Sequence, residues 1–195
     1  MAVREGRRSF KWRVDKPASI CFVSALDNGD PKKEVQFRDE LFQFDAPFKN
    51  DPVAILKTQN RYYQSFWCND TLAIVSDYWW NNRNQKTYLF NPSNPSKAPS
   101  IISDRNYQDR YSDPGDFVEE RNRYGEYVLL LRNKNLFLIG DGFSADGQFP
   151  FLDELKIGTF KKKRIYESTI EGEKESLRDF NPDDNKLFVR IESPN

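Results

Sequence analysis

The chain has 195 residues, which is enough for one domain with a sizeable hydrophobic core. Its 30 lysines and arginines equal its 30 aspartates and glutamates, so it lacks the basic excess of a general nucleic-acid-binding surface, and we expect no nucleic-acid partner. The sequence contains no histidine, which excludes histidine-ligated zinc and any Ser-His-Asp or Cys-His mechanism completed within this chain.

The N-terminus and the apolar runs give no sign of a membrane or of export. Residues 1–8 are polar and basic with no apolar segment behind them, and no run approaches the ~18 apolar residues of a membrane span. We therefore expect no membrane partner and no signal peptide, and the compartment stays open between cytoplasm, plastid and periplasm. Cys21 and Cys68 fit no metal-ligand spacing and do not demand a disulfide, so their redox state also stays open.

The predicted elements are short strands. Aromatic residues make up 15% of the chain, and apolar or aromatic runs alternate with turns rich in Asn, Asp, Gly and Pro. The strands of the first predicted unit cover residues 18–26, 34–44 and 53–57. Those of the second unit cover residues 62–67, 71–80, 86–91 and 98–103. Four strands in about 45 residues are typical of one β-propeller blade.

The same pattern continues after a polar connector. The strands of the third unit cover residues 117–121, 127–132, 136–140, 150–157 and 159–166. The last predicted strands cover residues 175–180 and 186–191. The chain therefore ends partway through a fourth unit of the pattern.

We predict an all-β fold, a partial β-propeller of about three to four blades with about four antiparallel strands each. The predicted blades cover about 18–58, 61–103 and 117–168, with a partial blade at about 174–192, in a single domain or fragment over residues 1–195. The alternative for the same strands is a two-sheet sandwich. A propeller normally closes with about four to eight blades, so this one would have open sheet edges, which favour self-association.

The connector "DRNYQDRYSDPGDF", residues 104–117, contains the most chemically suggestive side chains, and it has two interpretations. In the functional one, Arg105 or Arg110 faces a cavity and attracts an acidic peptide side chain, because guanidinium matches carboxylate geometry. In the structural one, Arg110 pairs with Asp109 or Asp113 and holds the connector in place. We favour the structural interpretation, because the backbone of such a loop lacks ladder partners and needs other hydrogen bonds.

Several stretches, in their order along the chain, resemble the propeller of glutamyl endopeptidases, which belong to the prolyl oligopeptidase clan of serine peptidases. These stretches are 12–18, 25–31, 77–80 with Trp79 and Trp80, the run Asp109, Arg110, Tyr111, Ser112, Asp113, Pro114 and Gly115, then 142–147 leading to 150–153, and finally 192–194. The resemblance implies an N-terminal β-propeller that caps an α/β-hydrolase domain and admits peptides rather than folded proteins. It also implies that the admitted peptides are cleaved after glutamate.

We expect the hydrolase domain itself to be absent from this chain. The nearest approach to the nucleophile sequence Gly-x-Ser-x-Gly is 142–146, where Asp146 replaces the second glycine and no helical pattern follows. The prediction is therefore a noncatalytic region with no catalytic residue, no metal and no cofactor, which meets a peptide substrate only through the missing domain. The alternatives are a stand-alone β-rich binding module for peptide or carbohydrate, and a gene remnant without activity.

The aromatic pair Trp79 and Trp80 has two interpretations as well. The two rings could form a binding platform, or one could pack between blades while the other lies near a strand end, and we favour the second arrangement. Asp15 and the pair 183–184 do not have the oxygen-ligand spacing of a calcium loop, so we assign them to turns.

Overall fold

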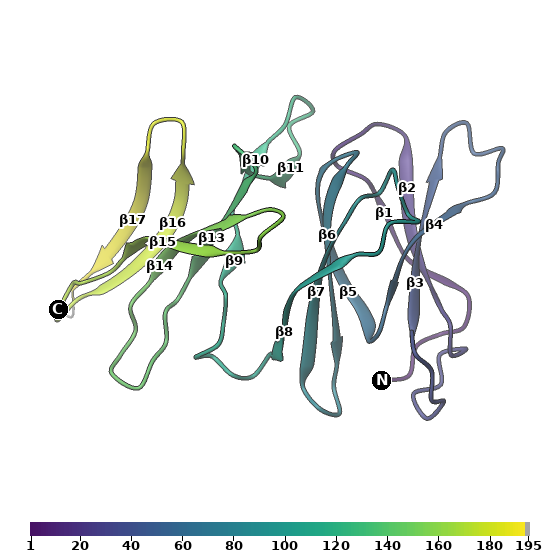
Figure 1. The fold of residues 1–195 in the computed structure, drawn as a ribbon, viewed down its shortest axis with the longest axis horizontal. Helices are drawn as coiled ribbons and strands as arrows, with labels where there is room; N and C mark the ends of the chain where they lie inside the picture. The colour runs from purple at the N-terminus through teal and green to yellow at the C-terminus, as the bar shows by residue number, and fades with distance from the viewer. Residues whose placement is uncertain (194–195) are drawn as a thin grey trace. The chain divides into compact units, whose positions relative to one another are not determined.

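The computed structural model describes residues 1–193 and consists, over those residues, of β-strands joined by turns and loops (Figure 1). The stretch 192–194 of the family resemblance extends to Pro194, which lies outside the described residues. No helix in the described part of the chain is long and apolar enough to cross a membrane. The predicted all-β class is confirmed, with four-stranded antiparallel sheets of the kind that form propeller blades.

The chain divides into two compact units. Unit 1 comprises residues 1–107 and 121–128, and unit 2 comprises residues 108–120 and those from 129 onward. All four tryptophans of the sequence belong to unit 1, at positions 12, 67, 79 and 80. Tryptophan fluorescence therefore reports the unfolding of unit 1 alone.

The first sheet of unit 1 is a four-stranded antiparallel meander. Its strands, in spatial order, are β1 (Arg7–Trp12), β2 (Ser19–Ala25), β3 (Asp39–Asp45) and β4 (Val53–Thr58). Strand β1 is not among the predicted strands, because it is exposed along almost its whole length and so lacks apolar alternation. A register shift between Arg8 and Lys11 marks a bulge in this edge strand, where Ser9 has a φ of 56°.

The second sheet of unit 1 follows the prediction closely. Its strands are β5 (Arg61–Asn69), β6 (Leu72–Trp79), β7 (Asn84–Phe90) and β8 (Ser100–Asn106), again in sequential antiparallel order. Strand β6 is buried at every position except Tyr78, which is why it was predicted from a near-continuous apolar run.

The two sheets of unit 1 lie side by side and share one hydrophobic core (Figure 1). Trp67 belongs to this core, with its ring edge-on to that of Phe90, the centroids 6.3 Å apart, and the guanidinium of Arg13 over it at 4.3 Å. The buried members from the two sheets are Cys21, Val23, Leu41, Ile55, Leu56, Trp67, Ala73, Val75, Tyr88 and Phe90. Because neither sheet buries these residues alone, each sheet depends on the other for its core.

Unit 2 contains a sheet of order β12-β13-β14-β15, with the short strand β9 also paired to β13. The strands are β9 (Asp116–Phe117), β12 (Leu131–Arg132), β13 (Asn135–Gly140), β14 (Phe151–Lys156) and β15 (Lys162–Glu167). The hairpin β16 (Lys174–Asn181) and β17 (Lys186–Glu192) supplies Leu177 and Phe180 to the core of this unit. The ring of Phe180 lies 5.1 Å from that of Phe137.

Two strands predicted as continuous are divided in the structure. The range 117–121 becomes β9 and β10 (Glu119–Arg121), and the range 127–132 becomes β11 (Tyr127–Leu129) and β12, with β10 and β11 paired to each other. The division falls at Val118, whose N–H donates to the Phe137 carbonyl and whose carbonyl accepts from the Leu130 N–H, both at 2.9 Å. A local apolar pattern does not encode such a change of partner.

A buried network of charges joins the two sheets of unit 1. Arg61, the first residue of β5, is almost fully buried and donates to Asp27 at 2.7 Å and to Asp39 at 3.0 Å. Arg38 also donates to Asp27, at 2.8 Å, and Arg8 pairs with Asp39. Each carboxylate also accepts a hydrogen bond from the backbone. The N–H of residue 29 donates to Asp27 at 3.0 Å, and the N–H of residue 62 donates to Asp39 at 2.7 Å.

The network fixes the ionisation of Asp27. Burial alone would raise the pKa of this carboxyl, but the hydrogen bonds from Arg61 and Arg38 outweigh burial and hold the pKa below its ordinary value. Arg38 in turn stacks on Trp79, with its Cζ 3.9 Å from the ring centroid. Charge pairing and aromatic packing therefore act at the same place between the two sheets.

We predict that Arg61→Met destabilises unit 1 by about 3–5 kcal/mol, because it leaves two buried carboxylates without their shared cation. Urea unfolding followed by tryptophan fluorescence measures the loss. The matched control is Lys11→Met, which removes an exposed cation of the same unit and should change stability by less than about 0.5 kcal/mol. Equal effects of the two substitutions would contradict a structural role for the network.

We also predict a pH dependence that belongs to Asp27. Because its folded pKa lies below the unfolded value of about 4, its stabilising effect is full above that pH and is lost as the pH falls through the folded pKa. The stability difference between the unchanged chain and Asp27→Asn should therefore shrink on acidification below about pH 4. The contributions of the other acidic side chains, including Asp77, to the pH dependence are the same in both chains and cancel in this difference. A difference that stays constant down to about pH 2 would contradict the prediction.

Candidate functional site

The connector of residues 108–115 is held by its own aspartates. Asp109 Oδ1 accepts a hydrogen bond from the N–H of Tyr111 at 3.0 Å, and Asp113 Oδ1 accepts one from the N–H of Gly115 at 3.0 Å. The Ser112 hydroxyl donates to the Asp109 carbonyl at 3.4 Å. These side chains replace the ladder partners that the loop backbone lacks, which is the physical basis of the structural interpretation.

Arg110 lies over the ring of Phe143, with its Cζ 3.5 Å from the ring centroid. This stacking contact comes from the loop after β13, and the sequence analysis did not predict it. The predicted pairing of Arg110 with Asp109 or Asp113 stays a prediction. Arg105, the other predicted contact residue, lies on β8 in unit 1, where it is the register partner of Gln85. The structure therefore places the two candidate arginines in different units.

Arg110 borders a cavity of about 300 Å³ in unit 2, but the charges around that cavity do not suit an acidic ligand. Its lining includes the guanidinium groups of Arg110 and Arg178 together with the carboxylates of Asp113, Asp116 and Asp141. Burial raises the pKa of Asp116, and the neighbouring Asp113 and Asp141 raise it further. An additional carboxylate would meet the same repulsion. The binding of an acidic side chain by Arg110 stays a prediction, and these charges weigh against it.

The two tryptophans of the stretch 77–80 have opposite environments. Trp79 is 8% exposed and lies beneath Arg38, whereas Trp80 is 54% exposed and has Arg83 over its ring at 3.8 Å. The difference follows from the strand itself, because successive side chains point to opposite faces.

Asp77, in the same stretch, is buried and accepts hydrogen bonds from four donors. These are the N–H and side-chain amide of Asn60 at 2.9 and 3.0 Å, the N–H of Lys86 at 3.1 Å, and the Tyr88 hydroxyl at 2.7 Å. Burial nevertheless raises the pKa of Asp77 above its ordinary value. These bonds tie the turn before β5 to β6 and β7, so Asp77 has a structural role here.

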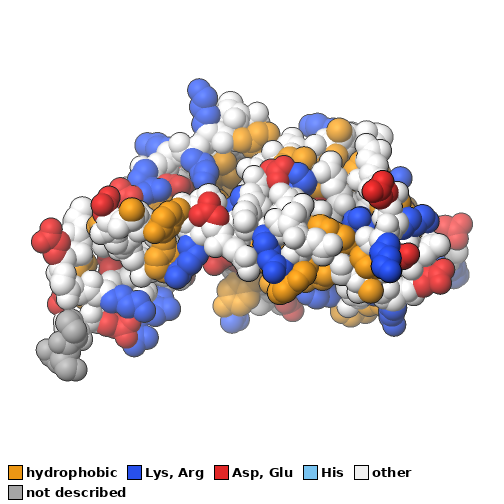
Figure 2. All heavy atoms as spheres, turned by 90° about the horizontal axis from the view of Figure 1, so that it is seen from below, with side chains coloured by type: hydrophobic (Ala, Val, Ile, Leu, Met, Phe, Trp, Pro, Cys, Tyr) orange, Lys and Arg blue, Asp and Glu red, His pale blue; other side chains and the backbone are white. Residues whose placement is uncertain are grey.

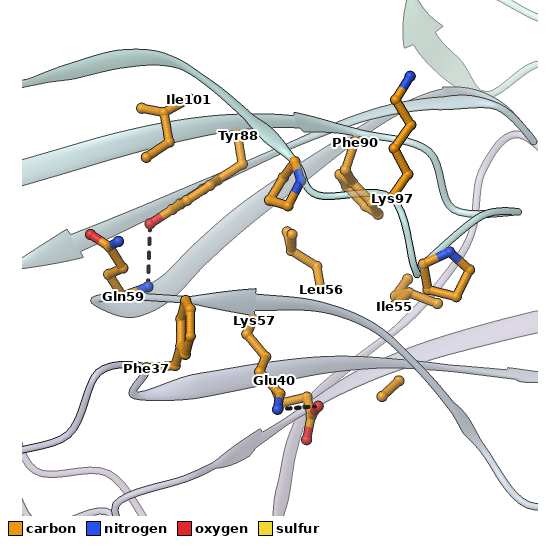
Figure 3. Close-up of a pocket in the computed structure, with 13 residues that line it drawn as sticks. Phe37, Glu40, Ile55, Leu56, Lys57, Gln59, Tyr88, Phe90, Lys97 and Ile101 are labelled. Atoms are coloured by element: carbon orange, nitrogen blue, oxygen red, sulfur yellow. Dashed lines mark hydrogen bonds and ion pairs between the residues drawn. The ribbon is translucent and has the colours of Figure 1, made fainter.

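A second cavity, of about 400 Å³, lies in unit 1 between strands of its two sheets (Figure 3). Its walls are largely apolar and come from β4, β7, β8 and the loop before β8, with Leu56, Phe90 and Ile101 among them. Its polar features are the Lys57–Glu40 ion pair at 3.7 Å and the Tyr88 hydroxyl, which accepts from the N–H of Gln59 at 3.2 Å. Sequence reasoning missed this cavity because its walls are far apart in the chain.

The lining of this second cavity includes one phenol, that of Tyr88. No serine or cysteine is among its lining residues. Burial and the nearby Asp77 raise the pKa of Tyr88 far above its ordinary value, so this phenol keeps its proton near neutral pH.

The stretch 142–146, which contains the incomplete nucleophile sequence, lies in a loop. It joins β13 to β14, and no helix follows it. The Ser144 hydroxyl donates to the Gly147 carbonyl at 3.1 Å and accepts from the N–H of Asp146 at 3.2 Å. Ser144 is therefore a turn residue. Residues 1–193 also contain no group of three or more acidic or cysteine side chains that could hold a metal ion, and Cys21 and Cys68 are not joined by a disulfide.

Two curated plant proteins are clearly similar to this chain. One is a probable chloroplastic glutamyl endopeptidase of Oryza sativa subsp. japonica, 37% identical over 177 residues, which cover 87% of this chain and 19% of that protein. The other, with the same description, is from Arabidopsis thaliana and is 37% identical over 178 residues, covering 87% of this chain and 18% of that protein. The chain is similar to one region of the glutamyl endopeptidases. The resemblance predicted from the ordered sequence stretches is thereby confirmed.

The chain spans about a fifth of the length of these relatives. No family model matches it. Among solved structures, TolB from Acinetobacter baumannii aligns with a TM-score of 0.43 and 15% identity, over 90% of this chain and 36% of TolB. An oligogalacturonate lyase in complex with manganese aligns with a TM-score of 0.40 and 13% identity, over 90% of this chain and 45% of the lyase.

We predict that Gly115→Ala destabilises unit 2 by about 2–4 kcal/mol more than Gly158→Ala. Both glycines have positive φ, +85° and +96°, so both substitutions strain the backbone. At position 115, however, the new Cβ would lie 2.5 Å from the Ile139 carbonyl oxygen, whereas at 158 it meets nothing within 4 Å. Amide hydrogen exchange along β13 measures the difference, and equal protection in both variants would contradict it.

Proposed function

We propose that this chain is a noncatalytic β-propeller region of a glutamyl-endopeptidase-like serine peptidase, in which it restricts the access of peptides to a separate α/β-hydrolase domain. The observation that carries the proposal is the 37% identity to glutamyl endopeptidases over 87% of this chain, which spans only about a fifth of their length. In this proposal, peptide substrates and a preference for glutamate belong to the whole enzyme.

The state of the nucleophilic side chains supports a noncatalytic role. The sequence has no histidine to act as a general base. Burial raises the pKa of the Cys21 thiol to about 12, so it is not a thiolate near neutral pH. The hydroxyls of Ser144 and Tyr88 are engaged in a turn and in a buried hydrogen bond to Asp77. Cleavage chemistry would then come from outside the 195 residues.

A gate that excludes folded proteins has to be stiff, and the interior of unit 1 supports that requirement. Its sheets share one core, and the Arg61 network ties them together through groups that are costly to separate. Loosening this network is therefore the most direct way to test gating.

The second candidate function is a stand-alone binding module for peptide or carbohydrate. The observation that favours it is the set of exposed aromatic side chains on the second sheet of unit 1, above all Tyr63 and Trp80. A stable monomer that binds such a ligand without any hydrolase partner would support this alternative.

The test uses the isolated chain and a chimera. The isolated chain should not cleave a short glutamyl peptide, and cleavage that a serine-directed inhibitor abolishes would contradict the proposal. In the chimera, this chain replaces the matching region of the rice protein. Arg61→Met in that chimera should raise the cleavage rate of a folded protein relative to that of a short glutamyl peptide, because a looser propeller is a poorer gate.

Lys11→Met in the same chimera is the matched control and should leave the ratio of the two rates unchanged. The gating role would be contradicted if Arg61→Met destabilised unit 1 in urea unfolding and yet left the ratio of the two cleavage rates unchanged. The family relationship would stand in that case.

A further inference from the structure

An aromatic pocket of about 320 Å³ lies on unit 1. It includes Tyr63 and Trp80, the exposed rings that favour the alternative function of a binding module, so the inference below deepens that alternative. Its lining residues are Tyr63 on β5, Tyr78 on β6, Trp80 just after β6, Gln85 on β7 and Tyr107 just after β8. Four of these five side chains are aromatic. Contributions from three strands of one sheet and from the segments that follow β6 and β8 make the pocket a product of the fold rather than of one loop.

The rings are arranged as a series of perpendicular walls. Tyr63 and Tyr78 have centroids 5.4 Å apart and planes at 83°, and Tyr78 and Tyr107 have centroids 5.9 Å apart and planes at 85°. Tyr63 occupies a register shift between residues 62 and 64, where β5 has one residue without a partner on β6. The bulge presents this ring to solvent, and it is 55% exposed. Because Tyr78 packs edge-to-face against both neighbours, the three rings form one continuous aromatic surface on which flat apolar groups such as pyrrolidine rings can stack.

The polar groups of the aromatic pocket are suited to a ligand that accepts hydrogen bonds. They are three phenol hydroxyls, an indole N–H and an amide, and no carboxylate is among the lining residues. The Tyr107 hydroxyl is itself buried, so Tyr107 contributes its ring to the pocket rather than a donor. The indole N–H of Trp80 can only donate. The ligand should therefore offer carbonyl oxygens more than N–H groups.

The charge beside the pocket is positive. The guanidinium of Arg83 stacks on Trp80 at 3.8 Å, and Arg105 is the register partner of Gln85. A cationic ligand would be repelled there, although aromatic cages elsewhere bind such cations. A negative charge next to the apolar part of the ligand would be attracted.

We propose that the aromatic pocket binds a proline-rich segment in the polyproline II conformation with an acidic residue beside its prolines. Such a segment has no internal hydrogen bonds, its prolines lack N–H groups, and its carbonyls are free to accept from tyrosine, tryptophan and glutamine. Its pyrrolidine rings can stack on the aromatic surface of the pocket, and its rigidity lowers the entropy lost on binding. The proposal does not depend on the peptidase relationship.

The experiment titrates the 195-residue chain with a short synthetic peptide of consecutive prolines and one flanking aspartate, using calorimetry and tryptophan fluorescence. We expect saturable binding that Trp80→Ala and Tyr63→Ala each weaken by about tenfold or more, because both remove a wall of the pocket. The matched controls are Trp12→Ala and Tyr111→Ala, which remove rings that are 58% and 68% exposed elsewhere on the chain and should leave affinity unchanged.

Two further arms test the chemistry. Replacing the flanking aspartate of the peptide by lysine should weaken binding, and added salt should reduce the difference between the two peptides. Tyr63→Phe keeps the ring and removes only the hydroxyl, so it should weaken binding less than Tyr63→Ala, and unchanged urea midpoints show that each variant is folded. The proposal is overturned if the proline peptide does not bind saturably, if Trp12→Ala weakens binding as much as Trp80→Ala, or if a soluble polysaccharide or tetramethylammonium binds at Trp80 and the peptide does not.

Discussion

The buried guanidinium of Arg61 is the group on which the packing of unit 1 depends. From the first residue of the second sheet it bridges Asp39, the first residue of β3, and Asp27, which lies in the turn between β2 and β3. A buried ion pair is not by itself a source of large stability, since desolvation offsets much of the attraction. Its effect is on specificity: the three groups can be buried together only when the two sheets meet in this one arrangement, because any displacement leaves a charge unpaired.

This constraint accounts for two of the stretches in which the chain resembles the glutamyl endopeptidases. Asp27 belongs to the stretch 25–31, and Trp79, which lies under Arg38, belongs to the stretch 77–80. Both residues build the junction between sheets. The stretch 109–115 is likewise a loop closed by its own aspartates. The similarity to glutamyl endopeptidases in such stretches therefore reports a shared architecture.

The sequence predicted strands best where burial is continuous and worst where it is absent. The second sheet was predicted almost completely because β6 is apolar along nearly its whole length, whereas the exposed strand β1 was missed. The role of Arg61 was also missed, because a single arginine at a strand start has no periodic signal. The stacking of Arg110 on Phe143, the apolar cavity of unit 1 and the aromatic pocket depend on residues that only the fold brings together. Pattern alone contains no information about such contacts.

Because successive side chains of a strand point to opposite faces, neighbouring residues at the end of β6 have different roles. Trp79 points inward to Arg38 and the buried charges, while Trp80 points outward to the aromatic pocket beneath Arg83. The inner residue is under the constraint of the core, where a change of volume or charge affects the whole unit. The outer residue is free of that constraint, so its ring can serve binding without weakening the fold. An exposed aromatic side chain beside a rigid buried junction is therefore well placed to hold a ligand, because the strand end that positions it cannot shift without breaking the Arg61 network.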